Sequence, residues 1–221
     1  MKAALLGFGI GLMITFFRML YIRKRDKEAD EIRDVTYGKE LKKYLEQQET
    51  RDVSQGHLND DDFWNIIDTT RGRSKENYKN QIGLLYDEFR TMNSDDIINF
   101  YTTYLMILSQ AISAKGIAAY SIISGAIEFV DIDQFFEWML CQGEIKLNNY
   151  THNPELLVNA KFDGIGNDNM LNFLSDAYFH KANKILPEIS GILQLDEEQI
   201  KQKDLPSLFP QLWNKFITVP R

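Results

Sequence analysis

Hydrophobic positions in the body of the chain recur at the three- and four-residue spacing of amphipathic helices. The polar run at residues 59–62 suits a helix N-terminus, because Asn caps helices and carboxylates complement the helix dipole. Three apolar faces follow: Phe63, Ile66, Ile67 and Thr70; Tyr78, Ile82, Leu85, Tyr86 and Phe89; and Ile97, Ile98, Tyr101, Leu105 and Leu108 after an Asn93-Ser94 cap. No run alternates as a strand would. The pattern predicts an all-α fold, a single compact multi-helix domain over residues 60–221.

Glycine and proline residues mark the expected boundaries of further helices in the second half of this domain. Gly116 interrupts the pattern before an apolar stretch at Ile117–Phe129, which we expect to form a core helix. The next helix carries an aromatic run and ends at Gly143 through a left-handed glycine cap. Pro154 suits the first position of a helix, and the last long helix is expected over Asn167–Asn183.

The N-terminal segment has a different pattern, with one charge in the twenty positions of residues 3–22. A helix of that length spans about 30 Å, the thickness of the hydrocarbon core of a bilayer. Arg18 lies near its C-terminal end, where a long side chain reaches the headgroups, and Tyr21 suits the interfacial aromatic belt. We therefore expect residues 1–22 to form one transmembrane anchor that enters the lipid bilayer through residues 3–22.

Two other interpretations of this segment stay open at the level of sequence. A cleaved signal peptide would use Lys2 as its basic start and Ala3–Phe17 as its apolar region, although no small-residue cleavage site follows. A buried helix of a soluble protein is the third interpretation. Whether residues 1–22 are retained or cleaved is therefore left undecided by the sequence.

Charge is distributed unevenly along the chain, whose formal net charge is −7. Residues 1–27 hold six basic residues and one acidic residue, a net charge of +5, so the remainder carries −12. Because the basic residues flank the predicted anchor on its C-terminal side, we expect a single-pass membrane protein with its N-terminus outside and its C-terminal domain cytoplasmic. The acidic body disfavours nucleic acid as a partner and suits a basic protein partner.

Residues 23–59 are expected to form a charged juxtamembrane linker, because their apolar positions are sparse. Within the predicted anchor, Ala3, Gly7 and Gly11 recur every four residues on one helix face. Small residues at this spacing let two membrane helices approach closely, so a homodimer through this face is one interpretation. The other is that glycine and alanine are simply common in membrane helices.

Known catalytic and cofactor motifs do not occur in the sequence, which lacks a phosphate-binding glycine loop and a nucleophilic serine elbow. Cys141 is the only cysteine, so neither a disulfide within the chain nor a cysteine-based zinc site can form. His57, His152 and His180 lie far apart without ligand spacing, and the loop at Asp163–Asn169 lacks the oxygen ligands of a calcium loop. The sequence therefore predicts no catalytic residue, no metal site and no cofactor.

Four stretches of the domain occur in a distinctive order: DFWNIID at residues 62–68, AAY at 118–120 with FFEWMLCQG at 135–143, NPELL at 153–157, and DLPSLFPQLW at 204–213. Over residues 61–217 their order and spacing resemble the bacterial "domain of unknown function forty-two forty" family. The resemblance implies an all-helical domain and nothing catalytic, because that family has no established activity. The family often has adjacent aspartates and a glycine before the helix of Trp138, where this chain has Phe129-Val130-Asp131.

Trp64, Trp138 and Trp213 lie in the most family-like stretches, and large aromatic residues at helical spacing usually pack in a core. If a ring edge is exposed beside Asp68 or Gln142, these two residues with Trp64 and Trp138 would form a partner groove. These four residues are the candidate partner groove that the sequence predicts.

Two classes of function follow from these patterns. The first, which we favour, is a membrane-tethered, non-catalytic protein-interaction module on the cytoplasmic side. The alternative is an enzyme with an unrecognised carboxylate or amide site, for example a buried pair of Asp68 and Glu137 whose environments push their pKa values apart.

Overall fold

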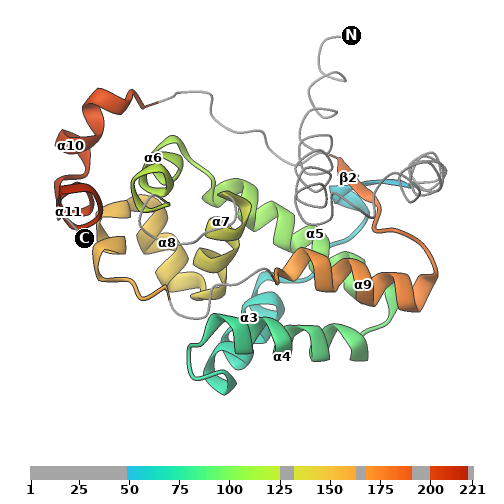
Figure 1. Ribbon diagram of the computed structural model, residues 1–221. Coiled ribbons are helices and arrows are strands. Elements are labelled where there is room, and N and C mark those ends of the chain that lie inside the picture. The colour runs from blue at the N-terminus through green and yellow to red at the C-terminus, as the bar shows by residue number, and fades with distance from the viewer. Residues whose placement is uncertain (1–48, 125–131, 163–167, 191–199, 219–221) are drawn as a thin grey trace, which may run out of the picture. The chain divides into compact units, whose positions relative to one another are not determined.

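The computed structural model describes residues 49–124, 132–162, 168–190 and 200–218 (Figure 1). These residues divide into two compact units, of which the first comprises residues 49–55 and 185–190 and the second comprises the other described residues. The predicted anchor at residues 3–22 and its stripe of Ala3, Gly7 and Gly11 lie outside the described residues.

The second unit is helical, in agreement with the mostly helical fold that the sequence predicts. Its longer helices are α3 (Asp60–Arg73), α4 (Tyr78–Thr91), α5 (Ser94–Ala111), α6 (Ala114–Ile123), α7 (Ile132–Cys141), α8 (Glu144–His152) and α9 (Met170–Ala182). Its short helical segments are η2 (Pro154–Asn159), η3 (Gln202–Asp204), α10 (Leu205–Leu208), α11 (Pro210–Trp213) and η4 (Asn214–Thr218).

The first unit holds a short parallel sheet that the sequence does not predict. Strand β1 (Thr50–Asp52) pairs with β2 (Glu188–Ser190), and the 3-10 helix η1 (Val53–Gln55) follows β1. The Ser54 backbone N–H donates to Asp52 Oδ1 at 2.9 Å, which fixes the turn between them. Strands of three residues are too short to show an alternating pattern, so this departure from an all-α fold had no sequence signal.

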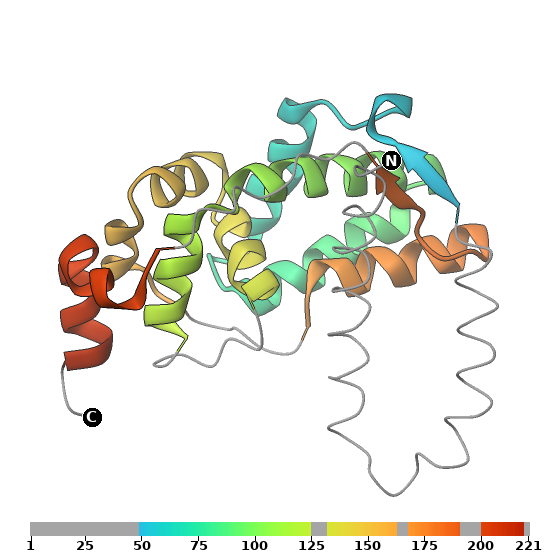
Figure 2. The same ribbon diagram turned by 90° about the horizontal axis from the view of Figure 1, so that it is seen from above.

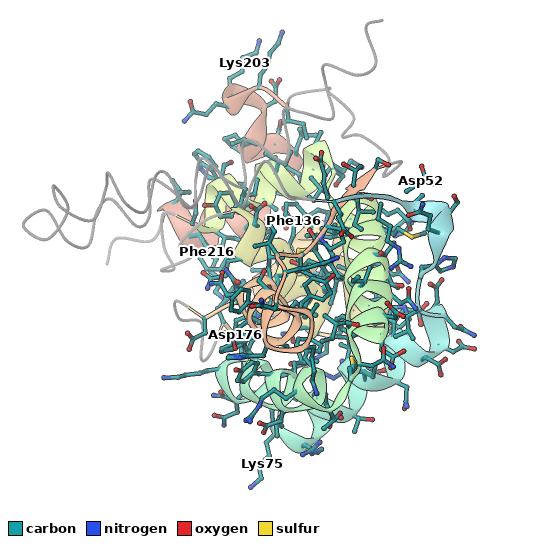
Figure 3. All side chains as sticks on the ribbon, turned by 90° about the vertical axis from the view of Figure 1, so that its right-hand side faces the viewer. Asp52, Lys75, Phe136, Asp176, Lys203 and Phe216 are labelled. Carbon is teal, nitrogen blue, oxygen red and sulfur yellow. The ribbon has the colours of Figure 1, made fainter. Side chains whose placement is uncertain are left out.

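Helix α7 is the central helix of the second unit, since it packs against α3, α4, α5, α6 and α8. All of its residues from Gln134 to Cys141 are buried. Phe136 is fully buried and lies among the helices in Figure 3. A helix buried on every side belongs to the core of its domain.

Helices α4 and α5 both pack against α9, and Figures 1 and 2 show α4 beside α9. The rings of Phe63 and Phe89, from α3 and α4, both lie against Phe100 of α5, at centroid distances of 4.7 and 4.9 Å. Ring pairs at these separations add attraction beyond their buried area, so they fix the three helices against one another.

The capping residues expected from the sequence begin two of these helices. Asn59 caps α3 by accepting a hydrogen bond from the backbone N–H of Asp61 at 2.9 Å. Asn93 caps α5 by accepting from the backbone N–H groups of Asp95 and Asp96, both at 2.9 Å. Both predicted helix starts are confirmed.

Gly116 does not interrupt a helix, so that expectation is wrong. It lies inside the first turn of α6, where its backbone N–H donates to Ser113 Oγ at 3.1 Å. A Cβ atom on Gly116 would lie 2.9 Å from two ring carbons of Phe136. The glycine therefore permits close packing of α6 on α7. Helix α6 comprises Ala114–Ile123, and residues 125–129 of the expected core helix lie outside the described residues.

Among the helices in the described part of the chain, none alone combines the length and apolarity of a membrane span. Helices α5 and α6 together meet that test by length and composition, but they bend by 85° at their junction.

Candidate functional site

Glu137 is the one buried carboxylate among the side chains that the described structure places in the core, with 2% of its surface exposed. It lies in the middle of α7, within a run that is otherwise almost entirely apolar. A charge in such a position is costly unless hydrogen bonds compensate for the lost water, so its partners define the site.

Three helices other than α7 supply hydrogen bonds to the Glu137 carboxylate. Its Oε1 accepts from the Tyr78 hydroxyl of α4 at 2.5 Å and from the Met170 backbone N–H of α9 at 2.8 Å. Its Oε2 accepts from the Tyr104 hydroxyl of α5 at 3.2 Å. The carboxylate therefore joins α4, α5, α7 and α9 at one buried point.

The pKa of Glu137 is raised to about 7 by burial, against the opposing effect of the hydrogen bonds from Tyr78, Met170 and Tyr104. Burial and the nearby Glu137 raise the pKa values of Tyr78 and Tyr104 well above their usual range, so both hydroxyls keep their protons and can donate. The same two causes raise the pKa of the Cys141 thiol, which is itself fully buried and therefore stays a thiol.

A carboxyl group with a pKa near neutrality can exchange a proton at physiological pH. Here both oxygens are already hydrogen-bonded to protein groups, and the side chain is closed to solvent. The Met170 backbone N–H is the first of α9, so the carboxylate also complements the positive end of that helix. In this conformation the cluster fixes α9 to the core.

The four residues of the predicted partner groove are placed at different depths. Trp138 is 1% exposed and packs against the rings of Phe162 and Tyr150, at centroid distances of 4.6 and 6.2 Å. Trp64 is partly exposed on α3, and its ring lies nearly perpendicular to that of Phe63 at a centroid distance of 5.2 Å. The indole of Trp138 is therefore a core element, whereas that of Trp64 reaches the surface.

Asp68 and Gln142 are brought together by a third residue, Arg71. The Arg71 guanidinium lies 3.0 Å from Asp68 Oδ1 and donates a hydrogen bond to the Gln142 backbone oxygen. The adjacent Gly143 has a φ of +89°, and a Cβ there would lie 2.5 Å from both Arg71 Nη1 and Asp68 Oδ1. Gly143 follows α7 with the positive φ of a glycine, but its ψ of 165° is not that of the predicted left-handed cap. The absence of a side chain at Gly143 leaves room for this ion pair.

Asp68 and Glu137 do not share partners, contrary to the pair considered from the sequence. Asp68 is 49% exposed and paired with Arg71, whereas Glu137 is buried among tyrosine hydroxyls. Sequence reasoning missed Tyr78 and Tyr104 as the partners of Glu137. The one available signal was a single carboxylate inside a long apolar run, which implies buried donors but does not identify them.

His57 is exposed, and His152 and His180 have different partners. His152 Nδ1 lies 2.7 Å from the Asn148 backbone oxygen, and His180 Nε2 lies 3.6 Å from Asp176 Oδ1. Within the residues that the structure describes, no group of three or more His, Cys, Asp or Glu side chains could hold a metal ion.

Five exposed aspartates gather at the starts of α3 and α5, and we call them the acidic patch: Asp60, Asp61, Asp62, Asp95 and Asp96. The backbone N–H of Leu58 donates to Thr103 Oγ1 at 2.8 Å and to the Asn99 backbone oxygen at 3.2 Å. Leu58 directly precedes the cap of α3, and Asn99 lies about one turn beyond the start of α5. These bonds hold the start of α3 against the N-terminal half of α5.

None of the salt bridges among the described residues includes an aspartate of the acidic patch. They join Arg71 to Asp68, Arg73 to Glu88, Lys146 to Glu76, and His180 to Asp176. One aspartate of the patch accepts a hydrogen bond from a neutral side chain: Asn93, the cap of α5, donates through Nδ2 to Asp96 Oδ2 at 2.6 Å. The patch therefore presents carboxylates to solvent without neutralising cations among the described salt bridges.

Comparison with known proteins identifies one family. The model of the family described as "Protein of unknown function (DUF4240)" matches residues 58–180, which is more than half of the chain. No curated protein and no solved structure matches the chain. The match confirms the predicted family resemblance over α3 to α9, and it ends before the closing segment at residues 204–213.

Proposed function

We propose that this chain, which belongs to the DUF4240 family, is a non-catalytic interaction module that a membrane anchor holds at the cytoplasmic surface. The observation that carries the proposal is the acidic patch. Its five carboxylates are exposed at the first turns of α3 and α5, two helices that the contacts of Leu58 join, and they lie outside the described salt bridges. A surface of this kind attracts a basic protein partner and steers its approach.

The interior chemistry supports the same proposal. Glu137 has hydrogen bonds to both oxygens, and the Cys141 thiol is fully buried with a raised pKa. Both side chains are buried between helices and do not reach the surface. The most unusual titratable groups of the described structure therefore have a structural role in this conformation.

The anchor supplies the second half of the proposed function. The apolar sequence at residues 3–22 and its basic flank favour insertion with the body on the cytoplasmic side. Confinement near one membrane raises the effective concentration of the acidic patch for a partner at that membrane. A weak contact would then suffice for recruitment.

The proposal is tested by crosslinking capture from native membranes with the full-length chain. One variant carries D60N, D61N, D95N and D96N, and a matched control carries D87N, E144Q, D168N and E188Q, four acidic residues that are also exposed. Both sets change the net charge equally. We expect the patch variant to lose a captured basic protein that the control retains.

Two results would contradict the proposal. Equal loss of the partner in both variants would mean that net charge, not the patch, attracts it. Retention of the partner in both would exclude these aspartates as the contact surface.

The enzyme alternative rests on a different observation, the near-neutral pKa of Glu137. A buried acid of this kind is suited to general acid–base catalysis if an opening of α9 admits a substrate. Turnover of a small molecule by the full-length protein that is lost in E137Q, with the helical content unchanged, would favour the enzyme over the interaction module.

A further inference from the structure

Helix α9 is packed against the rest of the second unit along one side only. It buries a single stripe against its neighbours α4 and α5, namely Met170, Leu174, Ala177 and Tyr178. All of its other residues are exposed or partly exposed, and Figures 1 and 2 show the helix (orange) beside α4. A helix with one buried stripe loses less packing when it opens locally than a helix buried on every side, such as α7.

The start of α9 contacts α7 through the Glu137 carboxylate. Met170, the first residue of α9, has no exposed surface and donates its backbone N–H to Glu137 Oε1 at 2.8 Å. Met170 therefore covers the carboxylate on this side while the helix is in place. Opening of α9 removes this cover and admits water to Glu137.

The hydrogen bonds that Glu137 receives come from donors on three other helices. Oε1 accepts from Tyr78 and Met170, and Oε2 accepts from Tyr104. These donors suit a carboxylate, but burial disfavours its charge. A proton on Oε2 removes the charge and can be donated to the Tyr104 hydroxyl oxygen, because a hydroxyl can accept as well as donate. Oε1 keeps both of its donors in either protonation state.

Ionisation of Glu137 has two opposing effects on the closed position of α9. The charge strengthens the hydrogen bonds and the attraction to the positive end of α9, which favours closure. The same charge is buried while α9 is closed, which favours opening. Burial is the larger effect, since the pKa of Glu137 is raised rather than lowered. Opening should therefore increase as the carboxyl ionises.

Other titratable groups surround the cluster. Burial and Glu137 keep the pKa values of Tyr78, Tyr104 and Cys141 well above their usual range, so these groups hold their protons near neutral pH. Asp133, one turn before Glu137 on α7, is exposed. The charged side chains nearest to α7 and α9 on the other elements are all at least partly exposed: Asp68 and Arg71 of α3, Lys79 of α4, Lys115 of α6, Lys146 of α8, and Asp176 and His180 of α9.

His180 is the second group through which pH could act on α9, because histidines change their charge near neutral pH. Its Nε2 lies 3.6 Å from Asp176 Oδ1 on the same helix. Asp176 Oδ2 in turn accepts a hydrogen bond from the Tyr86 hydroxyl of α4. A test of Glu137 must therefore separate its effect from that of His180.

From this arrangement we infer that α9 opens locally in a proton-linked step, in which the Glu137 carboxyl releases its proton to water as the start of α9 leaves α7. The closed state holds a neutral carboxyl and the open state a solvated carboxylate. Opening then gives solvent and ligands access to a carboxylate beside two tyrosine hydroxyls. This inference does not depend on the acidic patch or on the membrane anchor.

The pKa values of the two states set the pH range of the step. The carboxyl has a pKa of about 7 when α9 is closed and regains its ordinary value of 4.5 when it is solvated. Below pH 4.5 both states hold the proton, and above pH 7 neither does. The opening equilibrium should therefore rise with pH between these values and level off above 7.

The test is hydrogen exchange of the full-length chain between pH 5 and 8, followed by mass spectrometry of its peptides. The exchange rate of α9 amides is divided by that of the unfolded chain at the same pH, which gives an opening constant for the helix. E137Q removes the proton in question, and H180Q is the matched control that removes the other titratable contact of α9. Y78F keeps the carboxyl but removes a donor that lowers its pKa.

In the wild type we expect the opening constant of α9 to rise by about 70-fold from pH 5 to pH 8. Amides of α7 should exchange more slowly than those of α9 at every pH, because the opening is local. H180Q should retain the rise and E137Q should lose it. In Y78F the rise should continue to a higher pH before it levels off.

Three results would overturn the inference: an opening constant that is constant or falls as the pH rises, a rise that persists in E137Q, or equal exchange of α9 and α7 amides. If E137Q does not fold, Y78F decides in its place. A Y78F curve that levels off at the same pH as the wild type would then exclude Glu137 as the group that releases the proton.

Discussion

At the scale of single residues, the pH dependence of stability follows from Glu137. Its pKa is raised from 4.5 to about 7 in the folded protein, so the folded state holds a proton that the unfolded state has released. This contribution to stability is present below about pH 4.5 and is lost as the pH rises through 7. Over that range we expect a loss on the order of 3 kcal/mol in the free energy of unfolding.

The measurement is chemical denaturation of the wild type and E137Q at several pH values between 4 and 8. A glutamine cannot ionise, so the difference between the two proteins isolates the Glu137 proton. If the free energy of unfolding changed with pH in the same way for both proteins, Glu137 would not be the source of the pH dependence.

Tyr78 and Tyr104 donate to the same carboxylate at different distances, 2.5 and 3.2 Å. A hydrogen bond to a charged group contributes roughly 1.5–3 kcal/mol, and the shorter bond should be the stronger one. We expect Y78F to lower the free energy of unfolding at pH 8 by more than Y104F does. If Y78F and Y104F lowered the free energy of unfolding equally, the shorter hydrogen bond would not be the stronger one.

The site was only partly predictable at this scale. Glu137 could be singled out as a carboxylate in an apolar run, but its donors lie 59 and 33 residues away in sequence and on other helices. Tyrosine positions look like ordinary core positions in a helical pattern. Only the packing of α4 and α5 on α7 gives their hydroxyls a partner.

At the scale of elements, Asn93 is expected to stabilise α5 as its cap. It satisfies the backbone N–H groups of Asp95 and Asp96, which otherwise lack helical partners. We expect N93A to lower the free energy of unfolding by about 1 kcal/mol. N65A, at an exposed position within α3, is the control and should leave stability unchanged or slightly higher.

Glycines within the helices give opposite predictions. G116A places a methyl group 2.9 Å from the Phe136 ring and should cost about 1–3 kcal/mol through overpacking. G83A, where no atom lies within 4 Å of the added carbon, should stabilise α4 by about 0.5–1 kcal/mol. Thermal unfolding of the two variants distinguishes these effects, and a neutral G116A would show that Phe136 moves aside.

Helices with one buried face were the most predictable elements. α3 and α4 bury the positions that their periodicity marks, among them Phe63, Ile67 and Leu85. α5 departs from its predicted face, since Phe100 and Tyr104 are buried where Tyr101 and Leu105 were expected. A helix that packs against several neighbours buries more than one stripe, and its sequence is then apolar on too many sides to define one face.

At the scale of the whole molecule, the closing segment is expected to stabilise the body although it lies outside the family match. Leu212 has no exposed surface, and truncation of a buried leucine typically costs about 2–5 kcal/mol. We expect L212A to be destabilised within this range and L208A, whose side chain is about half exposed, to be nearly neutral. Equal stability of both variants would show that the segment is not packed on the body.

The sequence could predict the family, the mostly helical body and the acidic balance, because these depend on local patterns and composition. It could not predict the grouping of the acidic patch, which depends on the bonds from Leu58 to α5, a contact between elements 45 residues apart. For the same reason the sequence could suggest Asp68 and Gln142 as neighbours in a groove, but it could not identify Arg71 as the residue that contacts both.

The orientation at the membrane is a prediction at this scale. Because the basic flank of residues 3–22 favours the cytoplasmic side, protease added to intact cells should spare residues 60–221. Digestion of the body from outside, or a secreted chain that begins after residue 17, would contradict this topology.

The central claim, that the acidic patch contacts a partner at the membrane, is tested most directly by site-specific photo-crosslinking in cells. A photoreactive amino acid replaces Asn65, about one turn beyond Asp61 on α3, or the exposed Asn80 on α4 as the control. We predict a crosslink to one basic protein in the membrane fraction from position 65 that is absent from position 80 and is lost when the patch is neutralised. Crosslinks of equal yield from both positions, or a crosslink from position 65 that survives neutralisation, would contradict the claim.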